Sequence, residues 1–301
     1  MGVSQISQFT ASLCQRMRSG ADLTGESRCA TVFLPARCCL CWLIFCQLLL
    51  VPCALLASID DQAASFERRW QSIRLIEPPF SAAERARMYA VLEALPSQEA
   101  LSEMDLATLK NDVADKLLEE NPVTIETAQQ LTNSLKTPAY GDIWQDYCLQ
   151  KIPDLIEHLP LALEPSDLVA LLEQQVVSGD GSLAGTALIS LLRIHRLSPE
   201  LLAQAQLSKR VHSILEDQAM PVPCQITALL VGAEVQAPLA HARAHRILQA
   251  PDAPTMLKVA ALSTLARFAD SKDQALILSY TESKDNRLRR VAQTAYQTFK
   301  N

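Results

Sequence analysis

Glycine is scarce in this chain. Only 8 of its 301 residues are glycine, and aromatic residues make up 5% of the total. Rossmann folds, P-loops and tight β-hairpins need glycine where the backbone adopts positive φ or approaches a phosphate closely. Alternating runs of Val, Ile and Thr, which would indicate strands, are also hard to find. The composition therefore argues against Rossmann folds, P-loops and sheets rich in hairpins, and it predicts an all-α protein.

Cysteine is scarce outside the first 53 residues. Seven of the nine cysteines lie within them, and four of these stand in an apolar run without histidine, where cysteine behaves as a small hydrophobic residue rather than a metal ligand. Only Cys148 and Cys224 occur in the remaining chain. We expect two buried thiols, and a disulfide between them is the alternative if this part of the chain is exported.

Basic charge is in short supply for a protein that binds nucleic acid. The whole chain has 27 Lys and Arg against 33 Asp and Glu. Residues 1–57 hold four of the basic and two of the acidic residues, so the chain without them has 23 against 31 and a net charge of −8. Sequence-independent binding to nucleic acid depends on neutralising phosphates. We therefore predict no nucleic-acid partner.

The longest apolar run lies near the N-terminus. Residues 38–51 are uncharged and largely apolar, with Arg37 before them and Asp60 after them. Basic residues before an apolar run and acidic residues after it predict that the N-terminus stays on the inner side of the membrane and the rest of the chain lies outside. Two interpretations compete: a signal peptide cleaved after Ala57, or an uncleaved anchor in which residues 38–57 span the bilayer. A buried helix of a soluble protein is a third. We expect residues 1–57 to be an export segment, and the protein to be membrane-associated or periplasmic (extracytoplasmic).

The rest of the chain alternates between helical apolar patterns and proline-containing breaks. Ser81 and Glu84 have the spacing of a capping box, and Ser198-Pro199-Glu200 is typical of a helix start. The densest break runs from Pro160 to Pro165. We therefore divide this part into an N-terminal helical region, residues 58–160, and a repeat region, residues 161–301.

A repeat of about 31 residues is visible near the C-terminus. Two groups of apolar residues have the same helical spacing, shifted by 31 positions: Leu257, Ala261, Leu265 and Phe268, then Leu288, Ala292, Tyr296 and Phe299. Between them Ala275, Leu276 and Leu278 suit a shorter helix. A helix–turn–helix unit of this length cannot bury its own apolar face, so it must stack on its neighbours.

These segments resemble HEAT-type repeats. The sequence Met256–Asp270 has a basic residue and a valine before paired alanines, and Asp285–Ala292 has a similar pattern. The resemblance is good over residues 254–301 and weaker from about residue 165. It implies an α-α superhelix, a solenoid of antiparallel helix pairs, with a surface that binds other proteins. It does not imply a reaction.

Histidines provide the only candidate metal ligands. His241 and His245 are one helical turn apart, so they have the spacing to share an ion. The zinc-protease motif, however, needs glutamate at position 242, which is alanine, so we interpret the pair as half-buried or solvated. His158, His195 and His212 have no evident partners in the sequence. We therefore predict no metal, no cofactor and no catalytic residue.

A basic cluster near the C-terminus is the candidate partner-binding patch. It consists of Lys284, Arg287, Arg289 and Arg290. Arg287 and Arg290 share a helix face and would meet an acidic partner, although a solvated helix face explains the same pattern.

The sequence thus favours a protein-binding scaffold. An extracytoplasmic or membrane-tethered helical-repeat protein with a protein partner accounts for the export segment, the repeats and the lack of a catalytic motif, and no small-molecule ligand is evident. The alternative is an enzyme whose active site is assembled from dispersed residues, with His195, His212 or the pair His241 and His245 in a deep pocket. We regard enzymatic activity as undecided, with the balance against it.

Overall fold

The computed structural model describes residues 59–178, 181–217 and 219–299. Its α-helices are α3 (Phe66–Arg74), α4 (Ala82–Glu93), α5 (Glu103–Leu118), α6 (Ile125–Lys136), α7 (Asp142–Glu157), α8 (Pro165–Ser178), α9 (Gly181–Leu197), α10 (Gln204–Glu216), α11 (Val222–Glu234), α12 (Pro238–Gln249), α13 (Thr255–Phe268), α14 (Gln274–Tyr280) and α15 (Asn286–Thr298). Short 3-10 helices are η1 (Pro96–Gln98), η2 (Pro138–Tyr140) and η3 (Ser271–Asp273). These ranges contain no strand, which confirms the all-α prediction.

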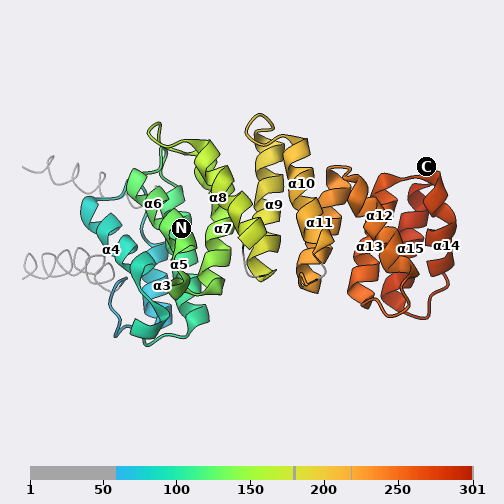
Figure 1. Ribbon diagram of the computed structural model, residues 1–301. Coiled ribbons are helices and arrows are strands. Elements are labelled where there is room, and N and C mark those ends of the chain that lie inside the picture. Colours follow the sequence, from blue (N-terminus) through green and yellow to red (C-terminus); the bar gives the residue numbers. More distant parts are fainter. Residues whose placement is uncertain (1–58, 179–180, 218, 300–301) are drawn as a thin grey trace, which may run out of the picture. The chain divides into compact units, whose positions relative to one another are not determined.

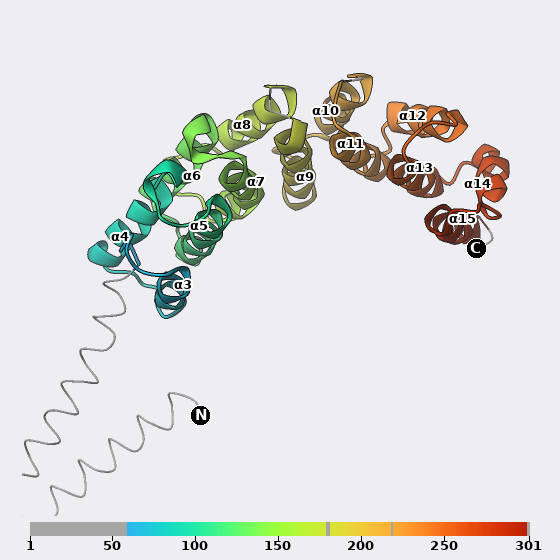
Figure 2. The same ribbon diagram turned by 90° about the horizontal axis from the view of Figure 1, so that it is seen from below.

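The described helices stack in two layers (Figures 1 and 2). Each odd-numbered helix from α3 to α13 contacts the next odd-numbered helix. The even-numbered helices form the second layer, in which α4 contacts α6, and α10 contacts both α8 and α12. Each even-numbered helix also packs on the odd-numbered helix that follows it in the chain. The fold is therefore a helical repeat, in agreement with the general prediction.

Local sequence signals explain where several helices begin. The side chains of Ser65, Ser102 and Thr124 each accept a hydrogen bond from a backbone N–H in the first turn of the helix that follows. Ser81 does the same for the N–H of Glu84, and the Glu84 carboxylate accepts from the N–H of Ser81 at 2.7 Å. The predicted capping box is therefore confirmed.

A single apolar core runs through the stack, from Ile59 to Ala295. Hydroxyl groups join neighbouring odd-numbered helices at two equivalent places. Ser190 on α9 donates to the carbonyl of Leu149 on α7 at 2.8 Å, and Thr264 on α13 donates to the carbonyl of Leu229 on α11 at 3.2 Å. Each bond also satisfies a polar side chain that the packing buries.

The predicted C-terminal repeat is confirmed as two longer helices, α13 and α15, with the shorter α14 between them. Ala261 and Ala292, which occupy equivalent positions, are both fully buried. Within α14 the buried residue is Ile277, whereas Leu278 is 47% exposed.

The helix start predicted at Ser198-Pro199-Glu200 is wrong. The N–H of Leu201 donates to the carbonyl of Ser198 at 3.0 Å, and α10 begins only at Gln204. Leu202, in the intervening turn, is fully buried, and its carbonyl lies 2.8 Å from Nδ1 of His195. Burying Leu202 requires a turn here, and this requirement outweighs the local preference for a helix.

Several predictions stay open. Residues 1–57 lie outside the described residues, so their role as an export segment and the location of the protein stay predictions. Within the described ranges no helix has the length and apolar character needed to cross a membrane. The division at residue 160 also stays a prediction. Cys148 and Cys224 are both buried thiols rather than the halves of a disulfide, as expected, and burial raises the pKa of each.

Candidate metal centre

Helix α12 positions the two histidines that are one turn apart. Proline occupies its first position, where the missing N–H costs no hydrogen bond. Ala240 and Ala244 are fully buried against neighbouring helices. His241 and His245 each follow one of these alanines, so they lie at the edge of the buried stripe, with side chains 26% and 29% exposed.

The turn after α13 supplies a carboxylate. Helix α13 ends at Phe268, and its C-cap residue Ala269 adopts a left-handed conformation with φ of 52°. Asp270 then caps η3, its carboxylate accepting from the N–H of Lys272 at 3.0 Å. This turn leaves the side chain of Asp273 fully buried against the two histidines of α12.

The three side chains converge on one point. Nε2 of His241 lies 2.7 Å from Oδ2 of Asp273, and Nε2 of His245 lies 2.6 Å from Oδ1. The two imidazole rings have centroids 5.0 Å apart, at 72° to each other. The ring of Phe268 packs on the His241 ring at 4.9 Å. One ligand atom from each of the three residues lies within 4.8 Å of the other two.

Without a metal, this arrangement satisfies a buried charge. A buried carboxylate is stable only when hydrogen bonds replace its lost hydration. Each Asp273 oxygen accepts one bond from a different imidazole Nε2, so both rings carry a proton on that nitrogen.

The same atoms are suited to hold a divalent transition metal ion. Two imidazole nitrogens and a carboxylate oxygen are typical zinc ligands, at about 2.0–2.2 Å from the ion. Tetrahedral coordination would place the ligand atoms roughly 3.3 Å apart. The hydrogen-bonded atoms would separate by less than an ångström, and the more distant ligand atoms, which lie within 4.8 Å of one another, would move closer together. Each ring would then carry its proton on Nδ1. Since both histidines reach the surface, the remaining coordination positions would face solvent.

Sequence reasoning missed Asp273. It stands 32 positions from His241 and 28 from His245, in a different helix–turn unit. The spacing of the two histidines is visible in the sequence, but alanine at position 242 argues against a zinc-protease motif. The third ligand comes instead from the stacking of α12 beside η3, for which the sequence contains no fixed spacing.

The arginines of the predicted basic patch each contact different neighbours. Arg289 donates to the carbonyl of Ser283 at 2.9 Å and to the side chain of Asn286. Arg287 approaches the sulfur of Met256 at 3.8 Å, and Arg290 lines a cavity of about 340 Å³ between α13 and α15. Whether these arginines and Lys284 bind a partner stays a prediction.

The remaining histidines have partners close by in the chain. His195 contacts the Leu202 carbonyl through Nδ1, as described above. His212 forms an exposed pair with Glu216, with Nε2 2.9 Å from Oε1, and also lines a cavity of about 320 Å³. Among the described residues, neither His195 nor His212 belongs to a group of three potential metal ligands.

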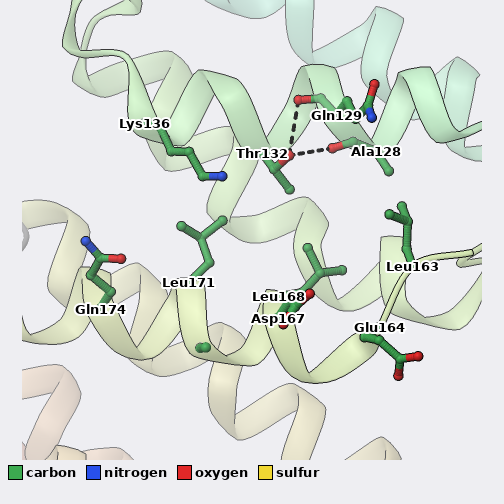
Figure 3. A pocket seen from close by; sticks show the side chains of 11 residues that line it. Ala128, Gln129, Thr132, Lys136, Leu163, Glu164, Asp167, Leu168, Leu171 and Gln174 are labelled. Atoms are coloured by element: carbon green, nitrogen blue, oxygen red, sulfur yellow. Dashed lines mark hydrogen bonds between the residues drawn. The ribbon is translucent and has the colours of Figure 1, made fainter.

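A cleft of about 380 Å³ separates α6 from α8 (Figure 3). Leu163, Leu168 and Leu171 form much of its apolar lining, with Lys136 toward one end and Glu164 toward the other. Both of these charged side chains are exposed, and their opposite charges lie at opposite ends of the cleft. None of the three residues of the His–His–Asp cluster lines the cleft. Its lining also points to no particular ligand, whereas the cluster brings three potential metal ligands together.

Comparisons with known proteins add little chemistry. No protein-family model and no curated protein sequence matches the chain. Among solved structures, the chain is similar to human deoxyhypusine hydroxylase in complex with glycerol, with 11% identity and a TM-score of 0.38 over 83% of this chain and 96% of that one. A likeness this distant carries no conclusion about the reaction or ligands of the present protein.

The predicted main function, a protein-binding scaffold, is corrected here. The correction rests on the three converging side chains of this chain, which form a polar site that the scaffold prediction leaves out. They support the alternative prediction, a site assembled from dispersed residues of a helical fold.

Proposed function

We propose that this protein is a HEAT-like repeat protein that binds a divalent transition metal ion through His241, His245 and Asp273. The observation that carries the proposal is the convergence of two imidazole nitrogens on one buried carboxylate, at 2.7 and 2.6 Å. Nitrogen ligands favour zinc-class ions over calcium or magnesium, which prefer oxygen.

The open coordination positions favour a catalytic over a structural metal. Structural zinc sites are closed by four protein ligands, whereas catalytic sites use three and leave a position for water or substrate. This chain offers three ligands, and both histidine side chains are partly exposed. The enzyme alternative therefore takes the form of metal-assisted chemistry on a substrate that approaches α12 and η3 from solvent.

Titration of the metal-free full-length protein with Zn²⁺ and Co²⁺ tests the proposal. Calorimetry should give one equivalent of Zn²⁺ per chain, and bound Co²⁺ should show the visible absorption of a low-coordinate nitrogen–oxygen site. Asp273→Asn and His245→Gln should each weaken binding by about tenfold or more, because each removes one of three ligands.

The matched control is His212→Gln. His212 also stands one turn from a potential ligand, Glu216, but it is exposed and has no third partner. Its replacement should leave the affinity and the stoichiometry unchanged. Equal affinities for the wild type and Asp273→Asn would refute the site, and so would a visible spectrum typical of hydrated Co²⁺.

A further inference from the structure

A further cavity lies between α9, α11 and α13. These three helices contact one another in order, and Figure 1 shows where they lie in the stack. Its volume is about 390 Å³, which is within the range of small-molecule sites. It is formed by different residues from the proposed metal centre, so the two sites can be tested independently.

The charged side chains of the cavity gather at one end, and the rest of its lining is apolar apart from Thr227 and Ser263. On α9, Ile189 and Arg196 both line it and are seven residues, or about two helical turns, apart. On α11, Thr227 and Glu234 have the same separation. Each helix thus contributes its charged residue at its C-terminal end, and Arg267 does so on α13.

The three charged residues form one linked group. The Arg196 guanidinium lies 2.7 Å from Oε1 of Glu234, and the Arg267 guanidinium contacts Oε2 of the same carboxylate. Two positive charges therefore share one negative charge, which leaves this end of the cavity with a net charge of +1. Both arginine side chains are 57% exposed, and a guanidinium has five N–H donors, so donors remain for an anion.

The other end exposes apolar surface. Ile189 is 52% exposed and Leu230 is 45% exposed, although both stand on helices whose neighbouring residues are deeply buried. Both side chains line the cavity. Apolar surface gathered in a concave site next to a few polar groups is typical of ligand-binding cavities.

We propose that this cavity binds a small amphipathic carboxylate, with its aliphatic chain against Ile189 and Leu230 and its carboxylate on Arg196 and Arg267. Arginine and carboxylate form charge-assisted hydrogen bonds, which are stronger than those between neutral groups. The net charge of +1 selects an anion over a cation, and the apolar end selects an alkyl chain over a short polar anion.

Calorimetric titration of the full-length protein with decanoate tests this proposal, with acetate and decyltrimethylammonium as comparison probes. We expect one saturable site for decanoate and none for either comparison probe. Arg196→Gln and Arg267→Gln should each weaken decanoate binding by about tenfold or more, since each removes a charge-assisted bond. Leu230→Asn should weaken it through the loss of apolar contact.

The control for the arginines is Arg193→Gln. Arg193 also lies on α9 and is 46% exposed, but it pairs with Asp154 outside this cavity. The Arg193→Gln substitution should leave the decanoate affinity unchanged. Thermal unfolding should show that all of the variants fold.

Equal binding of decanoate and decyltrimethylammonium would overturn the proposal, because the charged end would then select nothing. Full decanoate affinity in Arg196→Gln combined with Arg267→Gln would also overturn it. In that case the arginines would serve only to balance Glu234 and the C-terminal ends of the helices.

Discussion

Nε2 of His245 on α12 lies 2.6 Å from Oδ1 of Asp273 on η3, across 28 positions of the chain. His241 makes the equivalent contact with the second oxygen. The buried carboxylate thus joins two successive helix–turn units of the repeat. The metal centre proposed here is also a structural contact when no metal is bound, and this has a measurable consequence.

Asp273→Ala should destabilise the metal-free protein by about 1–3 kcal/mol, because two imidazole N–H groups lose their acceptor at a partly buried site. Urea unfolding in the presence of a chelator would measure the change. The matched control is Glu216→Ala, which removes the carboxylate of the exposed pair with His212 and should change the stability by no more than about 0.5 kcal/mol. An equal effect of both substitutions would contradict a structural role for Asp273.

Gly232→Ala should destabilise the protein and weaken metal binding together. A Cβ at Gly232 would lie 2.5 Å from Cβ of Ala240 and 2.9 Å from Cγ1 of Val211, so α12 would have to move away from α11. Overpacking of this kind typically costs about 1–3 kcal/mol. Since His241 follows Ala240 directly, the shift should reach the metal ligands. Thermal unfolding and Zn²⁺ titration would measure the two effects.

Gly185→Ala is the control for this substitution. There the nearest atoms to a new Cβ are Sγ of Cys224 at 3.3 Å and Oγ1 of Thr227 at 3.5 Å. The tighter of these contacts can relax by a small side-chain shift, and alanine is favoured over glycine within a helix by about 0.5–1 kcal/mol. Gly185→Ala should therefore be close to neutral, with unchanged Zn²⁺ affinity. A loss as large as that of Gly232→Ala would show that packing between α11 and α12 is not the cause.

The sequence predicts the fold better than it predicts the site. Periodic apolar residues and caps such as Ser81 depend on interactions within one helix, so their spacing in the chain reflects their positions in space. The helix start at Pro199 failed because a buried neighbour, Leu202, imposed a turn. Local preference was weaker there than the free energy gained by packing an apolar side chain.

The metal centre could be predicted only in part. His241 and His245 belong to one helix, so their spacing alone places them on one face. Asp273 meets them only because α12 lies beside η3, and residues 250–270 separate these two elements in the chain. No short motif encodes a contact of this kind.

Glu99→Ala should be among the most destabilising single substitutions in the N-terminal helices. The Arg69 guanidinium lies 2.8 Å from the Glu99 carboxylate, both side chains are 1% exposed, and Nε of Arg69 also donates to the carbonyl of Ile59 at 2.9 Å. Removing the carboxylate leaves a buried charge without its partner, which typically costs about 3–5 kcal/mol. Urea unfolding of the variant would measure this loss.

Two further variants separate the pair from a general charge effect. Replacing both members together, with Arg69→Met and Glu99→Leu, should cost less than Glu99→Ala alone, because no unpaired charge remains. Asp154→Ala, which breaks the more exposed pair with Arg193, should change the stability by about 0–1 kcal/mol. If the double replacement were as costly as Glu99→Ala, the loss would come from packing and not from the unpaired guanidinium.

Lys110 should make the stability of the protein depend on pH in the alkaline range. Its side chain is 1% exposed, its Nζ has no hydrogen-bond partner, and the ring centroids of Tyr140 and Trp144 lie 4.5 and 5.5 Å from that nitrogen. Burial lowers the pKa of Lys110 to about 8, against the opposing influence of Cys148 and Glu99. In the unfolded chain a lysine has a pKa of about 10.4.

The direction in which stability changes with pH follows from the number of protons that the folded and unfolded chains bind. Between the two pKa values the unfolded chain binds more protons than the folded protein, so stability rises with pH, by at most about 3 kcal/mol for this group. Below pH 8 the buried ammonium is fully formed and its cost is largest.

Lys110→Met should therefore be more stable than the wild type at pH 7, and this advantage should shrink as the pH approaches 10.4. Urea unfolding of both proteins across this range measures the difference. The control is Lys209→Met at an exposed position, whose stability relative to the wild type should not change with pH. A stability difference between Lys110→Met and the wild type that stays constant with pH would mean that Lys110 keeps an ordinary pKa in the folded protein.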